Sequence, residues 1–184
     1  MLAYVFWHWP QPGIERGAYL DHLADFHRTL AANKPQGFHR SIVFGISGAN
    51  WLNTTGEAYE EWYLLDDSAA MDRLNNAAVS GACEEPHNRV AREAADGTGG
   101  LYRFRAGNEN LAQSRFAMWL SKPNGVSYND FYAALQPLTD EGVGLWGRQM
   151  TLGPTTEFCI HSSSAIELPP GYTGQTIPLE VVWS

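Results

Sequence analysis

The two halves of this chain repeat one pattern of residues, and the repeat limits the folds open to it. An apolar, aromatic run at residues 2–9 ends in a PQPG turn at 10–13 and leads into a helical pattern. A second such run at 115–121 ends in KPNG at 122–125 before another helical pattern. A duplicated unit of this kind determines architecture far better than it determines chemistry.

Hydrophobic periodicity and turn residues predict the elements of each half. For the first half we expect the order β-α-β-β-α-β, with strands at 2–9, 38–47, 58–65 and 101–105 and helical segments at 15–32, 68–79 and about 86–96. For the second half we expect strands at 115–121, 145–152, 156–162 and 177–183 and one helix at 127–138. The segment 163–176 has two prolines, two glycines and no helical stripe, so the second half lacks its second helix.

The fold class predicted from this order is α+β, built from two fused ferredoxin-like repeats, βαββαβ then βαβββ, at residues 1–107 and 108–184. Two such units in one chain resemble the dimeric α/β-barrel superfamily, in which two ferredoxin-like sheets face one another around a cavity. The segment 122–127, with Phe131 on the following helix, looks most like an EthD-type segment. The resemblance implies small-molecule chemistry in a cavity, but no catalytic set of the family maps onto these residues. The two halves are expected to superpose about an approximate two-fold axis.

Composition excludes several classes of partner. The net charge is -8, and the 12 Lys and Arg residues are spread singly, which argues against binding to nucleic acid. No stretch approaches the roughly 18 consecutive apolar residues of a membrane span, and no secretory leader is recognised. Cys83 and Cys159 have no metal-ligand spacing. We expect a cytoplasmic protein with reduced thiols that binds neither nucleic acid nor membrane.

Strand alternation sorts the side chains into two faces. The mostly apolar face, expected under the helices, holds Val5, Trp7, Trp9, Phe38, Ile42, Phe44, Ile46, Trp62, Leu64, Tyr102 and Phe104, then Phe116, Met118, Leu120, Trp146, Met150, Leu152, Phe158 and Ile160. The opposite face mixes aromatic, imidazole and ionisable side chains, as ligand cavities do. We therefore expect the mixed face to line a cavity between the two sheets.

Three histidines on the mixed face, His8, His39 and His161, are the predicted proton-transfer residues. Tyr63 or Glu61 would orient them, which completes the predicted catalytic set. If two of the three histidines lie under the helices or in solvent, this hypothesis loses its residues, and a binding module becomes the better interpretation. The other predicted ligand contacts on this face are Tyr4, Phe6, Trp119, Ser41, Gln149 and Arg103.

Three functions remain open at this point. The first is a small-molecule enzyme, a cofactor-independent oxygenase, cyclase or similar, acting without a metal in an aromatic-lined cavity. The second is a non-catalytic binding module for a hydrophobic ligand or haem, with His161 or His39 as the axial ligand. The third is a structural protein whose cavity is filled by side chains.

Three further features are interpreted as structural. His27 lies on the buried stripe of the first helix and is expected in the core. The sequence GTGG at 97–100 follows a helix, so it is expected to form a C-cap and turn rather than a phosphate loop. The missing second helix would leave Phe158, Ile160, Val181 and Trp183 uncovered unless the 163–176 loop or a second copy covers them, and we favour a homodimer.

Overall fold

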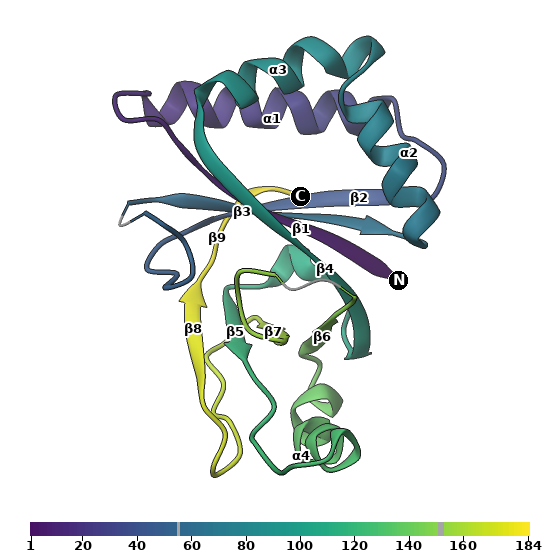
Figure 1. Ribbon diagram of the computed structural model, residues 1–184, viewed down its shortest axis with the longest axis vertical. Helices are drawn as coiled ribbons and strands as arrows, with labels where there is room; N and C mark the ends of the chain where they lie inside the picture. The colour runs from purple at the N-terminus through teal and green to yellow at the C-terminus, as the bar shows by residue number, and fades with distance from the viewer. Residues whose placement is uncertain (55, 151–152) are drawn as a thin grey trace.

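The structure is a computed structural model that describes residues 1–54, 56–150 and 153–184. Its elements follow the predicted order (Figure 1), except that the predicted final strand 177–183 is two strands, at 174–178 and 180–183, the first of which begins within the predicted loop. The first half contains β1 (Leu2–Pro10), α1 (Arg16–Ala32), β2 (Phe38–Ile46), β3 (Ala58–Leu65), α2 (Ser68–Ala78), α3 (Glu84–Glu93) and β4 (Ala94–Gly107). The second half contains β5 (Phe116–Leu120), α4 (Tyr128–Asp140), β6 (Gly144–Arg148), β7 (Phe158–Ser162), β8 (Gly174–Pro178) and β9 (Glu180–Trp183).

The described strands form one nine-stranded antiparallel sheet in the order β8-β5-β7-β6-β4-β1-β3-β2-β9, which confirms the predicted α+β fold. The first half contributes β4-β1-β3-β2, and the second half contributes β8-β5-β7-β6 in the corresponding order. Only Leu179 separates β8 from β9, yet they pair with strands near opposite ends of the sheet. The segment 174–183 therefore brings the two edges together. The division at residue 107 stays a prediction.

Helices cover two separate outer faces of this sheet. Figure 1 shows α1, α2 and α3 together on one side and α4 at the opposite end. The start of α4 has one half of the predicted capping box with Asp in place of Glu, because Ser127 Oγ accepts from the Asp130 backbone N–H at 3.1 Å. The Asp130 carboxylate accepts from the Ser127 hydroxyl at 2.7 Å. No helix in the described ranges has the length and apolar character needed to cross a bilayer.

Tryptophans pack the space that the curved sheet encloses. Trp7, Trp62, Trp119 and Trp146 are each at most 1% exposed and belong to one core cluster drawn from strands of both halves. Their rings meet edge to face, with centroids 5.5 Å apart for Trp7 and Trp119 and 5.1 Å apart for Trp62 and Trp146. Such contacts add to the stabilisation from burial itself.

This core corrects the predicted assignment of faces in the first half. The mostly apolar face, represented by Val5, Trp7 and Trp62, points into the enclosed space, and the mixed face lies under α1, α2 and α3. Alternation states which side chains share a face but not which face meets the helices. A strongly curved sheet whose edges come together leaves an interior that large side chains can fill, and the Trp-rich face fills it here.

The second half follows the predicted faces with two corrections. Met118, Phe158 and Ile160 pack in the α4 cluster as expected. Trp146 instead points into the enclosed core, and Met150 is 94% exposed rather than covered by a helix. The predicted strand 145–152 ends at Arg148, and positions 151 and 152, including the predicted Leu152, lie outside the described residues.

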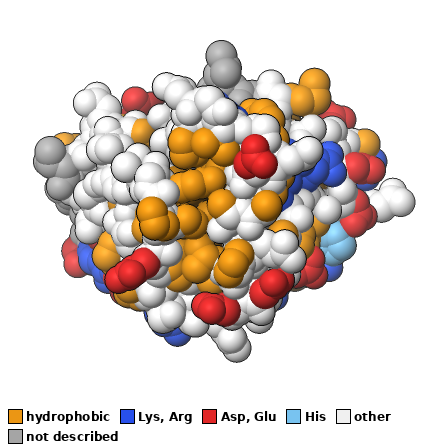
Figure 2. Space-filling view, turned by 90° about the horizontal axis from the view of Figure 1, so that it is seen from below, with side chains coloured by type: hydrophobic (Ala, Val, Ile, Leu, Met, Phe, Trp, Pro, Cys, Tyr) orange, Lys and Arg blue, Asp and Glu red, His pale blue; other side chains and the backbone are white. Residues whose placement is uncertain are grey.

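Four apolar residues were predicted to be uncovered because the second half lacks a helix. The chain itself covers two of them. Phe158 and Ile160 are at most 1% exposed, and Ile166, Leu168 and Tyr172 of the following loop pack against their cluster. Trp183 instead lies against α1, stacked on His27 with centroids 6.3 Å apart. Figure 2 shows apolar side chains among acidic ones on the face seen from below, towards which α4 lies in Figure 1. The homodimer stays a prediction.

Glu60 and His161 are two of the titratable groups in the enclosed core. Glu60 is fully buried and accepts from the indole N–H groups of Trp7 and Trp62, both at 2.7 Å. Burial raises the Glu60 pKa to about 7, although the two indole hydrogen bonds act in the opposite direction. Burial lowers the His161 pKa to about 3, and neither of its ring nitrogens has a hydrogen-bond partner among the described residues.

These two shifts should oppose each other in the pH dependence of stability. Because the Glu60 pKa is raised from 4.5 to about 7, the folded protein loses stability as pH rises through that window. Because the His161 pKa is lowered from 6.5 to about 3, stability rises with pH between those values. We compare the change in unfolding free energy between about pH 5 and about pH 6.5 in each variant with the change in the wild type. This change should be about 2 kcal/mol more positive in Glu60→Gln and about 2 kcal/mol more negative in His161→Leu.

Urea unfolding of the wild type and both variants at the two pH values measures these slopes. The other titrating groups are common to the three proteins, so only the differences between their curves count. Parallel curves for all three would contradict the predicted shifts.

Candidate functional site

A cavity of about 680 Å³ lies between the outer face of the first-half sheet and the helices above it. Its floor consists of side chains from β1 and β3, and its walls come mainly from α2 and α3. The cavity is thus outside the Trp-filled core, on the face that carries the mixed side chains. This position differs from the predicted one between two sheets.

Aromatic rings form the floor. The rings of Tyr4 and Phe6 lie 6.2 Å apart with planes 19° from parallel, and Phe6 and His8 lie 5.4 Å apart with planes at 18°. Gly99 and Gly97 stand opposite Phe6 and His8 on β4. A Cβ on Gly97 would clash with the Phe6 ring, and one on Gly99 would lie 2.9 Å from the Tyr4 hydroxyl oxygen. These two glycines let the floor rings lie across the neighbouring strand.

The same observation corrects the interpretation of GTGG at 97–100. These residues belong to β4 and pair with β1, rather than forming a helix C-cap and turn. Helix α3 ends earlier than expected, at Glu93, and β4 begins at once. The glycines serve packing against the rings of β1.

Glu61 is the centre of a buried polar network under α1. Its Oε1 lies 2.8 Å from His8 Nε2 and 3.5 Å from His27 Nε2. Its Oε2 accepts a hydrogen bond from the Tyr63 hydroxyl. All four side chains are at most 6% exposed, so the carboxylate is held by protein groups rather than by bulk water.

Two hydroxyl groups complete the network behind the imidazoles. Tyr19 Oη lies 2.6 Å from His8 Nδ1, and Ser41 Oγ lies 2.8 Å from His27 Nδ1. Both ring nitrogens of His8 are therefore hydrogen-bonded, whereas His27 Nδ1 is bonded and its Nε2 lies near Oε1 without a hydrogen bond.

The electrostatics agree with an ionised Glu61 beside neutral phenols. Burial acts to raise the Glu61 pKa, but the charges of His8 and His27 together with hydrogen bonding hold it below its ordinary value. Burial, followed by the Glu61 charge and the hydrogen bond to it, raises the Tyr63 pKa well above its usual range. Burial, with a smaller influence of Glu61, also raises the Tyr19 pKa.

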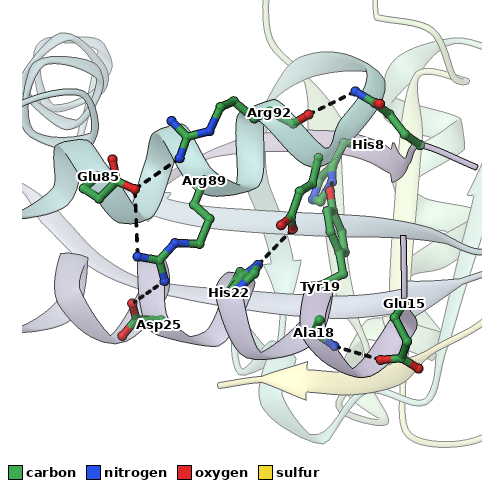
Figure 3. A network of polar contacts seen from close by, with 11 residues as sticks. His8, Glu15, Ala18, Tyr19, His22, Asp25, Glu85, Arg89 and Arg92 are labelled. Atoms are coloured by element: carbon green, nitrogen blue, oxygen red, sulfur yellow. Dashed lines mark hydrogen bonds and ion pairs between the residues drawn. The ribbon is translucent and has the colours of Figure 1, made fainter. Parts of the chain in front are cut away.

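Polar contacts hold the α3 wall of the cavity to α1 (Figure 3). A ring nitrogen of His22 lies 2.9 Å from the Glu93 carboxylate, and Arg89 lies within 3.9 Å of both Asp25 and Glu85. None of the α3 side chains is fully buried. This wall is therefore attached mainly by contacts near the solvent.

The structure brings five of the eleven predicted site residues into the cavity lining. They are Tyr4, Phe6, His8, Glu61 and Tyr63. Ser41 lies behind them and supports His27.

The other predicted residues lie elsewhere. Trp119 and His161 are in the enclosed core. Arg103 donates to Gln149 at 3.1 Å, and neither residue lines the cavity.

His39 is turned to the solvent, where a ring nitrogen lies 2.6 Å from Asp66. A register shift between Phe38 and Arg40 in the pairing of β2 with β3 explains its position, because a bulge redirects the extra side chain. His8 lies under the helices, so the predicted meeting of three histidines is wrong, and proton transfer by that trio is withdrawn.

Sequence reasoning missed two members of the network, Tyr19 and His27. The burial predicted for His27 is confirmed, but its contact with Glu61 was not foreseen. Tyr19, Leu23 and His27 recur every four residues along α1 and therefore share one buried face. Two hydrogen-bonding side chains on a buried helix face are a signal of polar partners on the sheet below.

A metal or haem is not supported by the residues present. Among the described residues, no group of three or more His, Cys, Asp or Glu side chains could hold a metal ion. The two predicted haem ligands do not fit that group, because His161 is buried against Trp62 and Phe44 and His39 is on the surface away from the cavity.

Comparison with known proteins gives the fold and no closer identity. No family model matches the sequence, and no curated protein matches it. A crystal structure from Fusobacterium nucleatum, described as a "putative monooxygenase", is 9% identical with a TM-score of 0.62 and covers 99% of this chain and 92% of its own. A structure from Lactobacillus acidophilus NCFM with the same description is 10% identical with a TM-score of 0.63, covering 99% and 94%. The chain shares the architecture of these structures.

Filling the space at Gly97 should narrow the cavity without unfolding the protein. In Gly97→Ala, the new methyl group would push the Phe6 ring away from β4, so we expect affinity for a flat aromatic probe such as 2-naphthol to fall about tenfold. Gly56→Ala is the matched control, because its Cβ would make only an ordinary contact, 3.7 Å from Thr54 Oγ1. Fluorescence titration measures the affinity of each variant for the probe. Equal affinities in Gly97→Ala and Gly56→Ala would show that the probe does not bind on this floor.

Proposed function

We propose that this protein is a small-molecule enzyme that binds an aromatic ligand in the helix-side cavity and removes a proton from it, with Glu61 as the proton acceptor. The observation that carries the proposal is the buried Glu61 carboxylate at an aromatic cavity floor, held by His8, His27 and Tyr63. Structural carboxylates are seldom buried unless paired. One that also lines a cavity is a candidate general base.

The geometry leaves Glu61 free to accept a proton. A carboxylate oxygen has two lone-pair sites, and Oε2 uses one of them for the Tyr63 hydroxyl. A ligand O–H or acidic C–H beside Tyr63 can therefore donate to the second site. His8 and His27 hold Oε1 and fix the orientation of the group, which is the role of a positioning residue.

The chemical step is a proton transfer in which the ligand loses a proton, so that its charge falls by one unit, while Glu61 becomes neutral. The total charge of the cavity does not change, so an acidic environment does not oppose the step. Among cofactor-independent oxygenases, cyclases and similar enzymes, we favour the oxygenase, with dioxygen as the second substrate. The descriptions of the two structural neighbours support this choice.

A non-catalytic binding module for a hydrophobic ligand is the alternative. The loss of the three-histidine site favours it, and so does the aromatic floor, which would bind a ligand without any chemistry. The ionised Glu61 favours the enzyme, because passive binding of an apolar ligand gains nothing from a buried charge.

A generic substrate can test the base directly. 5-Nitrobenzisoxazole is a flat, uncharged aromatic molecule. When a base removes its C–H proton, the N–O bond breaks and a coloured cyanonitrophenolate forms. We expect the wild type to show saturable turnover and the rate to fall by about 100-fold or more in Glu61→Gln. The absorbance of the product measures both rates.

Glu60→Gln is the matched control. Glu60 is the adjacent residue of β3, equally buried, but it faces the enclosed core and bonds to Trp7 and Trp62. Its rate should equal that of the wild type once circular dichroism confirms that both variants fold. Saturable binding without turnover by the wild type would favour the binding module, and equal rates in Glu61→Gln and the wild type would remove Glu61 as the base.

A further inference from the structure

Acidic side chains line the cavity, and no Lys or Arg among the described lining residues balances them. Glu61 lies at its floor, and Asp72 of α2 and Asp96 of β4 are exposed lining residues. Among the described residues that line it, none is Lys or Arg, although the chain has 12 of them. His87 is the lining side chain outside the Glu61 network that could carry a positive charge.

The arginines next to the lining residues are directed to other partners. Arg73 follows Asp72, but its Nε donates to the Gln36 carbonyl at 2.8 Å. Arg89 precedes Val90 and lies near Asp25 and Glu85. The cationic side chains closest in sequence therefore do not offset the charge of the lining.

The start of α2 does not supply an anion site either. Ser68 opens this helix and lines the cavity, and a helix N-terminus attracts negative charge. The Asp67 carboxylate already occupies that position, accepting from the Ala70 N–H at 2.9 Å. Asp72 and Asp96 have no ion-pair partner in the described part of the chain, and Asp96 Oδ1 accepts only from the Gly97 N–H, at 2.7 Å.

We infer that the cavity selects aromatic amines in their protonated form and excludes aromatic carboxylates and phosphates. The ring lies on the floor of Tyr4 and Phe6, and the ammonium group lies near one of the two exposed acids of the lining, Asp72 of α2 or Asp96 of β4. Aromatic faces attract cations, so floor and acids act together. The net charge of -8 also favours approach of a cation. This inference rests on the proposed function, because it names the ligand class of the same cavity.

Three probes with one ring system and different charge test the inference. Naphthalen-2-ylmethylamine is cationic at neutral pH, naphthalen-2-ylmethanol is uncharged and 2-naphthoate is anionic. In fluorescence titrations of the whole protein at low salt, we expect the amine to bind tightest and the naphthoate at least tenfold more weakly than the alcohol. Added salt should reduce the advantage of the amine, because it screens exposed charges.

Charge-removing variants locate the effect. Asp72→Asn and Asp96→Asn should each weaken binding of the amine about threefold to tenfold and leave the alcohol unchanged. Glu109→Gln removes the same charge from an exposed residue outside the cavity lining and should change none of the affinities.

Naphthoate binding as tight as amine binding, or an amine affinity equally insensitive to all three variants, would overturn the inference. The turnover of 5-nitrobenzisoxazole is independent of this outcome and judges the proposed function separately. A cation preference without that turnover would leave the ligand class standing and remove the catalytic role. Failure of all three probes to bind would overturn the ligand class and the role of the cavity together.

Discussion

Strand β3 is buried along its whole length on both faces, and this constraint shapes the rest of the molecule. Consecutive side chains of a strand point to opposite faces, so Glu60 and Glu61 enter two different compartments. The closed side offers Glu60 two indole N–H donors, and burial favours its neutral form. The helix side offers Glu61 two imidazoles and a phenol, which favour the charged form. One dipeptide thus supplies a structural carboxyl and a candidate base.

The order of the elements could be predicted because periodicity and turn residues are local properties. The predicted limits of β3 are those of the structure, and the predicted N-cap at Ser127 is present. The faces of the first half could not be predicted, because alternation alone does not say which side of a strand the helices cover. Segment 174–183, far from β2 in sequence, closes the interior that decides this.

The candidate site was predictable to the extent that it lies on neighbouring strands. His8, Glu61 and Tyr63 were placed on one face by alternation, and the pairing of β1 with β3 does bring them together. His39 was lost to a register shift that no local signal in the sequence marked. Tyr19 and His27 belong to the site because α1 packs over these strands, and helix placement depends on contacts between distant segments.

The attachment of α3 has a kinetic consequence. A helix without fully buried side chains, held by partly exposed ion pairs, is expected to detach at a smaller free-energy cost than the strands beneath it. Since α3 forms one wall of the cavity, its detachment gives a route in and out for a bound molecule. Ions that weaken the contacts between α1 and α3 would then shorten the residence time of an uncharged molecule and speed its entry in the same proportion. Its affinity would stay the same, and the rate of exchange would be set at the helix pair rather than at the floor.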